Sequence, residues 1–447
     1  MPLLLALLAV LLLAAPARAA TEATWIVTLD GPRTATTQRI LDTGAGALAF
    51  EHLPFVAIKA TPAQLRAVRR LPGVARVDPN SRIVPALAET RAAVGVEPLH
   101  VAGVTGAGIT VAQSDSGVDG LHPDLGGAVR AHHEALASTA DVLSLGWAQG
   151  VRAEDVPLAF TVGADSPVAQ DATSGHGTHV AGIAVGRGTA SGGRLRGIAP
   201  GASLVSIGHG DAGFVLAPLA GWDWLLGVHR RLGVQAVNNS WVANPQEGLF
   251  VRDARHPINV ASKRLHDEGV AVVFAAGNVG PAAGTTNVWG GWPWTITVGN
   301  ACIDTKPALL APACEGGRPT ALATTSSRGT ADGRVPGPDL VAPGTGVISL
   351  RATGSVNRQM PFPDEEVEFC GLPLADVLRY TCISGTSMAA PHVTGTIALM
   401  EQAAKRDLTP DELKKALVKT ARPLAGHGVH EQGAGMLDAA AAVRRVG

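Results

Sequence analysis

From Gly108 onward, short β-branched and apolar runs alternate with segments of helical periodicity, and this alternation constrains the fold more than any other feature. The expected strands are 109–111, 204–207, 270–274 and 296–298, and the expected helices are 179–185, 216–232 and 258–266. Such alternation favours a mostly parallel sheet with helices on both faces, because each parallel connection must cross over the sheet. The sequence therefore predicts an α/β domain whose chemistry lies at the carboxyl ends of its strands.

Asp115 follows the first expected strand, in the string Ser114-Asp115-Ser116-Gly117. Gly117 lets the chain turn sharply, which leaves the carboxylate at the tip of the strand. An aspartate just before a glycine is most often only a turn residue. Asp115 is therefore a weak candidate on its own and gains weight only with other residues.

A second candidate is His176, in the string Gly175-His176-Gly177-Thr178-His179. The glycines clear space around an imidazole at the start of a helix. Because His176 and His179 are three residues apart, they could instead bind a metal from one helical face. A zinc site needs further ligands and often the pattern His-Glu-x-x-His, which is absent here. The metal alternative is disfavoured but stays open.

Two further strings contain groups suited to acyl chemistry. Ser387 follows Gly385-Thr386 and leads into the apolar helix expected at 394–404, so it lies near a helix N-terminus, where amides and the helix dipole favour negative charge. It could also simply cap this helix. Asn278 ends an apolar strand and could donate to an oxyanion together with the Ser387 amide, or be an ordinary turn residue.

The order of Asp115, His176, Asn278 and Ser387, with their local strings, resembles the subtilisin-like serine proteases over about residues 103–443. The resemblance also covers the strings 120–125, 197–200, 338–344 and 433–440. It implies a serine endopeptidase that acts on polypeptides through an acyl-enzyme and needs no cofactor for catalysis. It implies that Ser387 is the nucleophile, His176 the general base, Asp115 the group that orients it, and Asn278 the oxyanion donor.

The same resemblance places Ser240, Trp241 and Val242 along the pocket for the residue before the cleaved bond (P1). Ala276 and Gly277 would form the opposite wall. Relatives usually have glycine where this chain has Val242, so we expect a narrower pocket that prefers small or medium apolar residues. Trp289 or Trp292 could narrow it further.

Structural calcium is not expected at the usual loop of this family. Asp124 matches a calcium ligand of many relatives, but the loop 186–194 that would complete the site has two arginines and no carboxylate or asparagine. Calcium needs six to eight oxygen ligands, usually some of them anionic. Calcium elsewhere in the chain stays open.

The N-terminal region is expected to divide into two segments. Residues 1–19 are apolar up to Ala15 and end in Ala17-Arg18-Ala19, which is typical of a signal peptide and too short to span a bilayer; a buried N-terminal helix is the alternative. Residues 20–88 form a small α/β unit that resembles the inhibitory propeptide of the family, and residues 89–447 are the catalytic domain. We expect a secreted monomer without a membrane anchor, extracellular or periplasmic.

Within residues 20–88, strands are expected at 25–29, 55–58 and 74–77 and helices from 34 and over 61–70. Thr61 can cap the second helix, and Pro62 suits its first position. From 85 to 100 the pattern weakens, as in a linker.

Cysteines occur at four positions that form two local pairs of the same spacing: Cys302, Cys314, Cys370 and Cys382. The local pairing is the simplest of three connectivities and would give two disulfides in an exported protein. Zinc binding is the rival, but neither pair has the short gap of a zinc knuckle.

Charge excludes a polyanion as the main partner. With 36 basic and 37 acidic residues, the formal net charge is −1, and nucleic-acid binding usually requires a concentrated basic face. Two other function classes remain as alternatives: a binding protein on an inactive protease fold, and a metallohydrolase built on His176 and His179.

Overall fold

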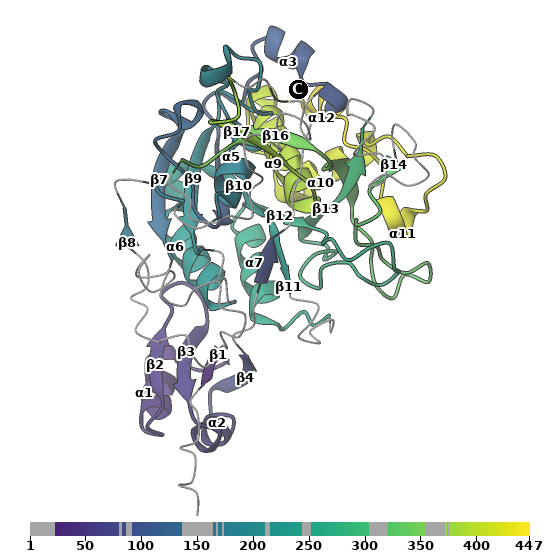
Figure 1. Ribbon diagram of the computed structural model, residues 1–447. Helices are drawn as coiled ribbons and strands as arrows, with labels where there is room; N and C mark the ends of the chain where they lie inside the picture. Colours follow the sequence, from purple (N-terminus) through teal and green to yellow (C-terminus); the bar gives the residue numbers. More distant parts are fainter. Residues whose placement is uncertain are drawn as a thin grey trace, which may run out of the picture.

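The computed structural model of the chain describes residues 23–79, 83–85, 92–135, 164–166, 169–171, 174–210, 215–243, 252–303, 321–353, 372 and 375–447. Figure 1 shows a small N-terminal unit (purple) next to a larger unit built on a central sheet. The expected signal peptide lies outside the described residues. Within the described part of the chain, no helix combines the length and apolar character needed to cross a bilayer.

A nine-stranded, mostly parallel sheet forms the centre of the larger unit, as predicted. Its order is β14-β13-β12-β10-β6-β9-β7-β8, and β15 also pairs with β13. The strands are β6 (Thr110–Asp115), β7 (Val129–Glu134), β8 (Ala164–Asp165), β9 (Ser203–Gly208), β10 (Val234–Asn239), β12 (Ala271–Ala275), β13 (Thr295–Cys302), β14 (Ala321–Leu322) and β15 (Leu340–Pro343). Only the β13–β14 and β7–β8 pairs are antiparallel.

Helices cover both faces of this sheet. α5 (His176–Val185) and α9 (Thr386–Ala404) pack on one face, and α6 (Leu216–Leu232) and α7 (Pro257–Asp267) on the other. Neighbouring strand residues alternate between the two cores, so that Val273 faces α9 and Phe274 faces α6. The alternation is the period-two pattern of a sheet buried on both sides.

Two helices begin earlier than their sequence pattern predicts. α5 starts at His176 instead of 179, and α9 starts at Thr386 instead of 394. The added residues of α5 include Gly177, and the eight added residues of α9 include Pro391, so these segments lack an uninterrupted helical pattern and depend more on tertiary contacts. These are the two turns that contain His176 and Ser387.

The N-terminal unit is a four-stranded antiparallel sheet of order β2-β3-β1-β4 with two helices. Its elements are β1 (Ala23–Leu29), α1 (Arg33–Leu41), β2 (Gly46–Ala49), β3 (Phe55–Ala60), α2 (Pro62–Val68) and β4 (Val74–Pro79). Thr61 caps α2 through a reciprocal capping box with Gln64, as its position predicts. The sequence analysis missed β2 because Gly-Ala-Leu-Ala has little β-propensity.

Asp223 of α6 attaches the N-terminal unit to the larger one. Its carboxylate accepts hydrogen bonds from the backbone amides of Glu51, His52 and Leu53 at 2.7, 2.6 and 2.7 Å. Leu53 and neighbouring apolar side chains of the unit continue the core that contains Trp222. Figure 1 shows α6 and α7 between the sheet and this unit.

A second connection is ionic. Arg76 of β4 binds Asp78 of the same strand at 2.6 Å and reaches across to Asp253, just before α7. Desolvation raises the pKa of Asp253, but the hydrogen bonds from Arg255 and then from Arg76 outweigh it and lower the pKa to about 2. The unit is thus attached to both α6 and α7.

The expected linker at 85–100 is only partly irregular, which corrects the prediction. Residues Ile83–Pro85 form β5, which pairs antiparallel with β11 (Trp241–Ala243), and Glu97–Val101 form the short helix α3. The remaining elements are η1 (Ala92–Val94), η2 (Pro123–Leu125), η4 (Thr189–Ser191), β16 (Val347–Leu350), β17 (Tyr380–Ile383), α10 (Pro410–Thr420), α11 (Val429–Gln432) and α12 (Ala439–Val446).

Two of the four cysteines are within the described residues. Cys302 and Cys382 are each disulfide-bonded. Cys314 and Cys370 lie outside the described residues, so the local pairing stays a prediction.

Glu401, near the C-terminal end of α9, should make the stability of the fold depend on pH. This buried carboxylate accepts the amide of Leu408 with both oxygens, at 3.3 and 3.1 Å, and burial raises its pKa to about 7. The pKa of Glu401 is higher in the folded protein than in the unfolded one, so protonated Glu401 contributes fully to the free energy of unfolding below the unfolded pKa. This contribution is lost as the pH rises through about 7.

We therefore expect Glu401→Gln, which keeps an acceptor for Leu408, to stabilise the fold at pH 9 by up to about 3 kcal/mol and to change little at pH 5. Thermal unfolding of both proteins at the two pH values measures this difference. Equal differences at both pH values would contradict the assignment.

Candidate active site

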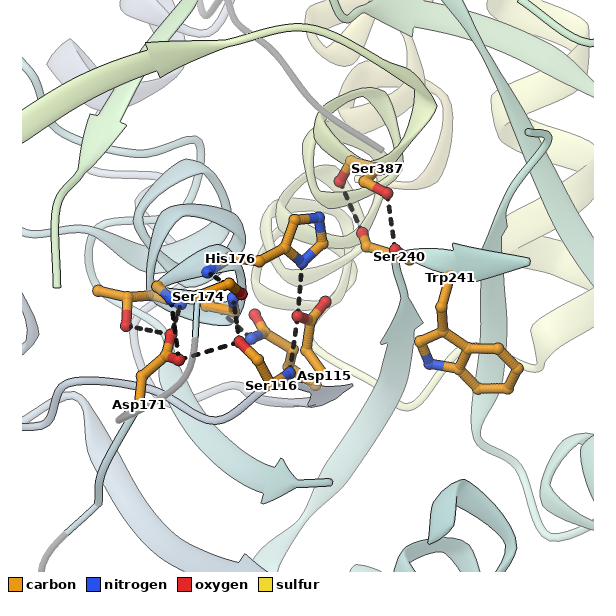
Figure 2. A network of polar contacts seen from close by, with 12 residues as sticks. Asp115, Ser116, Asp171, Ser174, His176, Ser240, Trp241 and Ser387 are labelled. Carbon is orange, nitrogen blue, oxygen red and sulfur yellow. Dashed lines mark hydrogen bonds and ion pairs between the residues drawn. The ribbon is translucent and has the colours of Figure 1, made fainter. Parts of the chain in front are cut away.

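Asp115 and His176 form a buried pair at the carboxyl edge of the sheet. Asp115 is the last residue of β6, His176 is the first residue of α5, and Asp115 Oδ1 lies 2.6 Å from His176 Nδ1. Each residue is only 3% exposed. Asp115 Oδ1 also accepts the amide of Ser116 at 2.8 Å, which fixes the carboxylate relative to the turn. The two candidates from the sequence are therefore in direct contact (Figure 2).

Glycines make this contact sterically possible. Gly117 has a φ of +127°, and a Cβ on Gly177 would lie 2.1 Å from the Gly117 carbonyl oxygen. Any larger residue at 177 would push α5 away from the tip of β6. Gln113 strengthens the approach, since its Nε2 donates to the Gly177 carbonyl at 2.7 Å. The hydroxyl of Ser114, by contrast, is buried without a partner among the described residues.

Asp171 holds the start of α5, and the sequence analysis missed it. Its carboxylate accepts the amides of Gly175 and Thr178 at 3.1 and 2.9 Å, and the hydroxyls of Ser116 and Thr178 at 3.1 and 2.7 Å. Burial raises the pKa of Asp171, while the bonds from Thr178 act against that shift. No local pattern marks it, because the N-cap of α5 is Gly175 and Asp171 lies four residues before that position.

Ser387 is the second residue of α9 and exchanges two hydrogen bonds with Ser240. Pro391 lies inside α9 and has no N–H, so it cannot donate to the Ser387 carbonyl, its usual helical partner. Ser240 Oγ donates to this carbonyl at 2.6 Å instead, and Ser387 Oγ donates to the Ser240 carbonyl at 2.6 Å. Ser240 thereby fixes the first turn of α9.

Figure 2 shows the relative position of the three side chains. In this view the imidazole of His176 lies between the Asp115 carboxylate and Ser387, which comes from the opposite side on α9. β6, α5 and α9 thus bring together residues that are widely separated in sequence. The structure thus places Ser387 on the side of the imidazole that faces away from Asp115 in this view.

Asn278 lies next to the start of α9 with its carboxamide held in one orientation. Its Oδ1 accepts the backbone amide and the hydroxyl of Thr386 at 2.9 and 3.1 Å. The Thr386 hydroxyl in turn accepts the amide of Gly277 at 3.0 Å. Because both donors approach Oδ1, the Nδ2 group of Asn278 is directed away from Thr386 and is available as a donor.

Two aromatic residues expected at the substrate pocket, Trp241 and Trp289, lie in the core instead. The Trp241 ring is buried, its Nε1 donates to the Ser114 carbonyl at 2.9 Å, and it packs against the Trp289 ring at 5.5 Å. Trp289 is also buried, so both rings belong to the core. The Trp241 side chain therefore does not line the expected pocket.

Val242 and Gly277 approach each other across the expected pocket. A Cβ built on Gly277 would lie 3.8 Å from Val242 Cγ1, which is ordinary van der Waals contact. Ala276 behind this wall is fully buried. The space between β11 and the 276–277 segment is therefore narrow.

His179 does not share a partner with His176. Its Nε2 lies 3.2 and 3.3 Å from the carbonyl oxygens of Val347 and Thr381, and burial lowers its pKa to about 3. A neutral ring held by two carbonyls donates its Nε2 proton to them. His176 directs its Nδ1 to Asp115, so each imidazole has its own protein partner and the pair is poorly arranged for a shared metal.

Asp124, which matches a calcium ligand of many relatives but was not expected to bind calcium here, is surrounded by hydrogen-bond donors. Ala190 donates its amide to one carboxylate oxygen at 2.7 Å, and the Tyr380 hydroxyl donates to the other at 2.7 Å. Burial, together with Asp124, raises the pKa of Tyr380, so the hydroxyl keeps its proton. This donor set does not fit a cation, which would need acceptors at these positions.

Comparison with known proteins points to one family. The model of the subtilase family matches residues 106–435. Serine protease AprX of Bacillus subtilis is 29% identical over 70% of this chain and 61% of its own length. An extracellular protease of Xanthomonas campestris is 30% identical over 76% of this chain and 52% of its own length.

Among solved structures, fervidolysin from Fervidobacterium pennivorans, a keratinolytic enzyme related to subtilisin, has the same fold. The TM-score is 0.67 at 22% identity, over 95% of this chain and 61% of that one. The chain thus spans about 61% of the length of AprX and of fervidolysin.

Asp171 generates a prediction for this site. Asp171→Ala removes the acceptor of four hydrogen bonds, so we expect it to lower the free energy of unfolding by about 2–3 kcal/mol. It should also loosen the start of α5 and slow reactions of Ser387. Asp332→Ala is the control, because Asp332 is an exposed carboxylate that also accepts a hydroxyl. Equal stability losses in chemical denaturation would show that Asp171 has no special role.

Proposed function

The chain belongs to the subtilase family, and on this premise we propose that it is a serine endopeptidase that hydrolyses peptide bonds in polypeptides. Ser387 is the nucleophile, His176 the general base, and Asp115 the residue that orients His176. The observation that supports this most directly is the buried 2.6 Å contact between Asp115 and His176, with Ser387 on the far side of the ring.

Proton transfer is the first task of the site. Asp115 accepts the Nδ1 proton of His176, which selects the tautomer whose lone pair is on Nε2. As Ser387 Oγ attacks the substrate carbonyl, it gives up its hydrogen bond to Ser240 and transfers its proton to His176. Asp115 stabilises the resulting imidazolium without taking the proton.

Stabilisation of the oxyanion is the second task. We assign it to the backbone amide of Ser387, in the first turn of α9, and to Nδ2 of Asn278. The positive end of the α9 dipole adds to the same effect. Thr386 contributes indirectly, because it fixes the Asn278 oxygen and so directs Nδ2 outward. As the intermediate collapses, the C–N bond breaks and His176 gives its proton to the leaving nitrogen, which leaves an acyl-enzyme on Ser387. Water, deprotonated by His176, then hydrolyses this ester and restores the Ser387 hydroxyl.

The N-terminal unit is proposed to act as an intramolecular inhibitor that is later removed. Its attachment to α6 and α7 and the pairing of β5 with β11 support this role. We further propose secretion of a monomer, extracellular or periplasmic, as the N-terminal sequence suggests. An extracellular protease among the relatives supports export.

Labelling with a fluorophosphonate tests the proposed function. Because the N-terminal unit is proposed to block the site, the probe is added after this unit has been released. It should then phosphonylate Ser387 with loss of fluoride, fail with Ser387→Ala, and react much more slowly with His176→Ala. Ser384→Ala, three residues upstream, is the matched control and should be labelled normally. Asn278→Ala should remain reactive but lose about 10²–10³-fold in kcat, a magnitude established for the same kind of donor in subtilisin.

The alternative function is a binding protein on an inactive protease fold. A wild-type chain that resists the probe, or equal labelling of Ser387→Ala, would favour that alternative. A metallohydrolase at His176 and His179 would lose activity with chelators instead of with the serine reagent.

We also propose that the Asp124 loop is stabilised by hydrogen bonds instead of calcium. A chelator such as EGTA should leave the unfolding temperature unchanged, whereas Tyr380→Phe should lower stability by about 1–3 kcal/mol because it leaves a buried carboxylate oxygen unpaired. Calorimetry with and without EGTA measures both effects. A chelator effect that calcium reverses and that Asp124→Asn abolishes would refute the proposal.

A further inference from the structure

A second carboxylate lies in the same row of the sheet as Asp115. Asp115 of β6 and Glu134 of β7 are both aligned with Gly208, the last residue of β9, which lies between them. Residues in one row of a sheet direct their side chains to the same face, and on that face Asp115 meets His176 of α5. The Glu134 carboxylate therefore shares the face and the carboxyl edge of the Asp115–His176 pair.

Gly208 brings the Glu134 carboxylate closer to this pair. A Cβ on Gly208 would lie only 2.8 Å from Glu134 Oε2, so Glu134 leans from β7 across the glycine toward β6. The two strand spacings between Glu134 and Asp115 amount to about 10 Å, and Oε2 is close to the midpoint. A side chain at position 208 would fill this place and displace the carboxylate. Glu134 thus faces the Asp115 side of the edge across a position where β9 has no side chain.

His132 fixes the Glu134 carboxylate. The buried imidazole directs Nε2 to Glu134 Oε1 at 2.6 Å and Nδ1 to the Ser206 hydroxyl at 2.9 Å. Ser206 has no other side-chain hydrogen bond within the described part of the chain, so its hydroxyl donates to Nδ1 and the neutral ring donates its Nε2 proton to Glu134. Glu134 keeps its negative charge, and its side chain is 38% exposed. Its second oxygen, Oε2, has no hydrogen-bond partner among the described residues and can accept one from a bound cation.

The pairing of β5 with β11 shows how an extended peptide fits the neighbouring edge. The two strands are antiparallel, and Pro85 is aligned with Trp241. Ser240 precedes Trp241, and its carbonyl accepts the Ser387 hydroxyl at 2.6 Å. A substrate that pairs with β11 in the same direction has its P1 residue opposite Ser240, beside the nucleophile. The second residue before the cleaved bond (P2) is then opposite Trp241.

Neighbouring residues of β11 face opposite sides, and the P1 and P2 side chains of a paired peptide do the same. Val242 faces the segment after β12, since its Cγ1 lies 3.8 Å from the place of a Cβ on Gly277. Trp241 faces the other way, because its Nε1 donates to the Ser114 carbonyl of β6 and its ring packs against His209, which follows β9. Aligned residues of an antiparallel pair have their side chains on the same side. The P2 side chain therefore points toward the ends of β6 and β9.

We propose that Glu134 is a specificity-determining residue that selects substrates with lysine or arginine at P2. This inference rests on the proposed function and deepens it, because it names the substrate class of the same site. The P2 side chain points to the ends of the two strands that lie between the peptide and Glu134, and Gly208 has no side chain to block its path. Lysine and arginine carry their charge on a long stem, which can cross the remaining half of the row. A carboxylate already fixed by His132 loses little freedom when it binds them.

Two substrates that differ only at P2 test this preference: acetyl-Ala-Ala-Lys-Ala p-nitroanilide and the same peptide with norleucine in place of lysine. Norleucine has an apolar stem without the charge. After release of the N-terminal unit, kcat/KM should be about 10-fold higher for the lysine substrate, as one partly shielded ion pair predicts. Glu134→Gln, which keeps an acceptor for His132, should bring this ratio to about 1 because kcat/KM for the lysine substrate falls.

Asp165→Asn is the matched control. Asp165 is also an exposed carboxylate next to a histidine, and its Oδ1 lies 3.1 Å from His133 Nδ1. The His133 ring stacks on Trp224 of α6, so this pair belongs to the opposite face of the sheet. Asp165→Asn should therefore keep the preference for the lysine substrate.

Salt gives a second readout that needs no variant to fold. Sodium chloride at about 0.5 M should lower the ratio in the wild type, because it screens the ion pair, and leave the ratio of Glu134→Gln unchanged. Equal kcat/KM values for the two substrates in the wild type, or the same ratio in Glu134→Gln as in the wild type, would overturn the inference and leave the proposed function intact. A wild type that hydrolyses neither substrate would overturn both.

Discussion

The close approach of the β6 tip to the first turn of α5 is the constraint on which the site depends. Gly117 and Gly177 allow backbone contact at this point, and Gln113 and Asp171 hold it. A carboxylate can then meet an imidazole at 2.6 Å in a place closed to water. In such surroundings a hydrogen bond to a charged group is strong, and leaving it unpaired is costly. The fold therefore fixes the tautomer of His176 before any substrate arrives.

The first turn of α9 is likewise held by a hydrogen bond from outside the helix. A proline six residues into the helix would ordinarily weaken it, because the Ser387 carbonyl loses its partner. Ser240 supplies the missing hydrogen bond, and it also precedes β11, the strand whose edge is proposed to bind the peptide. The proposed nucleophile and this strand are thus coupled through one pair of hydrogen bonds. A shift of β11 would move Ser387, so the position of a bound peptide and the position of the attacking oxygen are set together.

The sequence alone could predict the α/β fold and the strings that contain Asp115, His176 and Ser387, because strand periodicity and glycine-rich turns are local signals. It could not predict Asp171, since its four donors come from 116, 175 and 178 and assemble only in the fold. β2 and β5 were missed for a related reason: short strands with little intrinsic preference depend on a neighbouring edge. Trp241 was expected in the pocket, but its side chain is in the core, because alternation along β11 cannot be read from three residues.

Docking and release of the N-terminal unit place opposite demands on its contacts. Asp223 and Asp253 hold the folded part of the unit, whereas β5 adds only three residues of strand pairing at the cleft. While the chain is continuous, the short tether gives β5 a high effective concentration at β11, so weak pairing is sufficient to occupy the edge. The proposed removal of the unit would first leave it attached only through its contacts with α6, α7 and β11, so that its dissociation becomes a bimolecular equilibrium. The rate at which the cleft opens would then be set by the contacts of Asp223 and Arg76, which lie far from the catalytic residues.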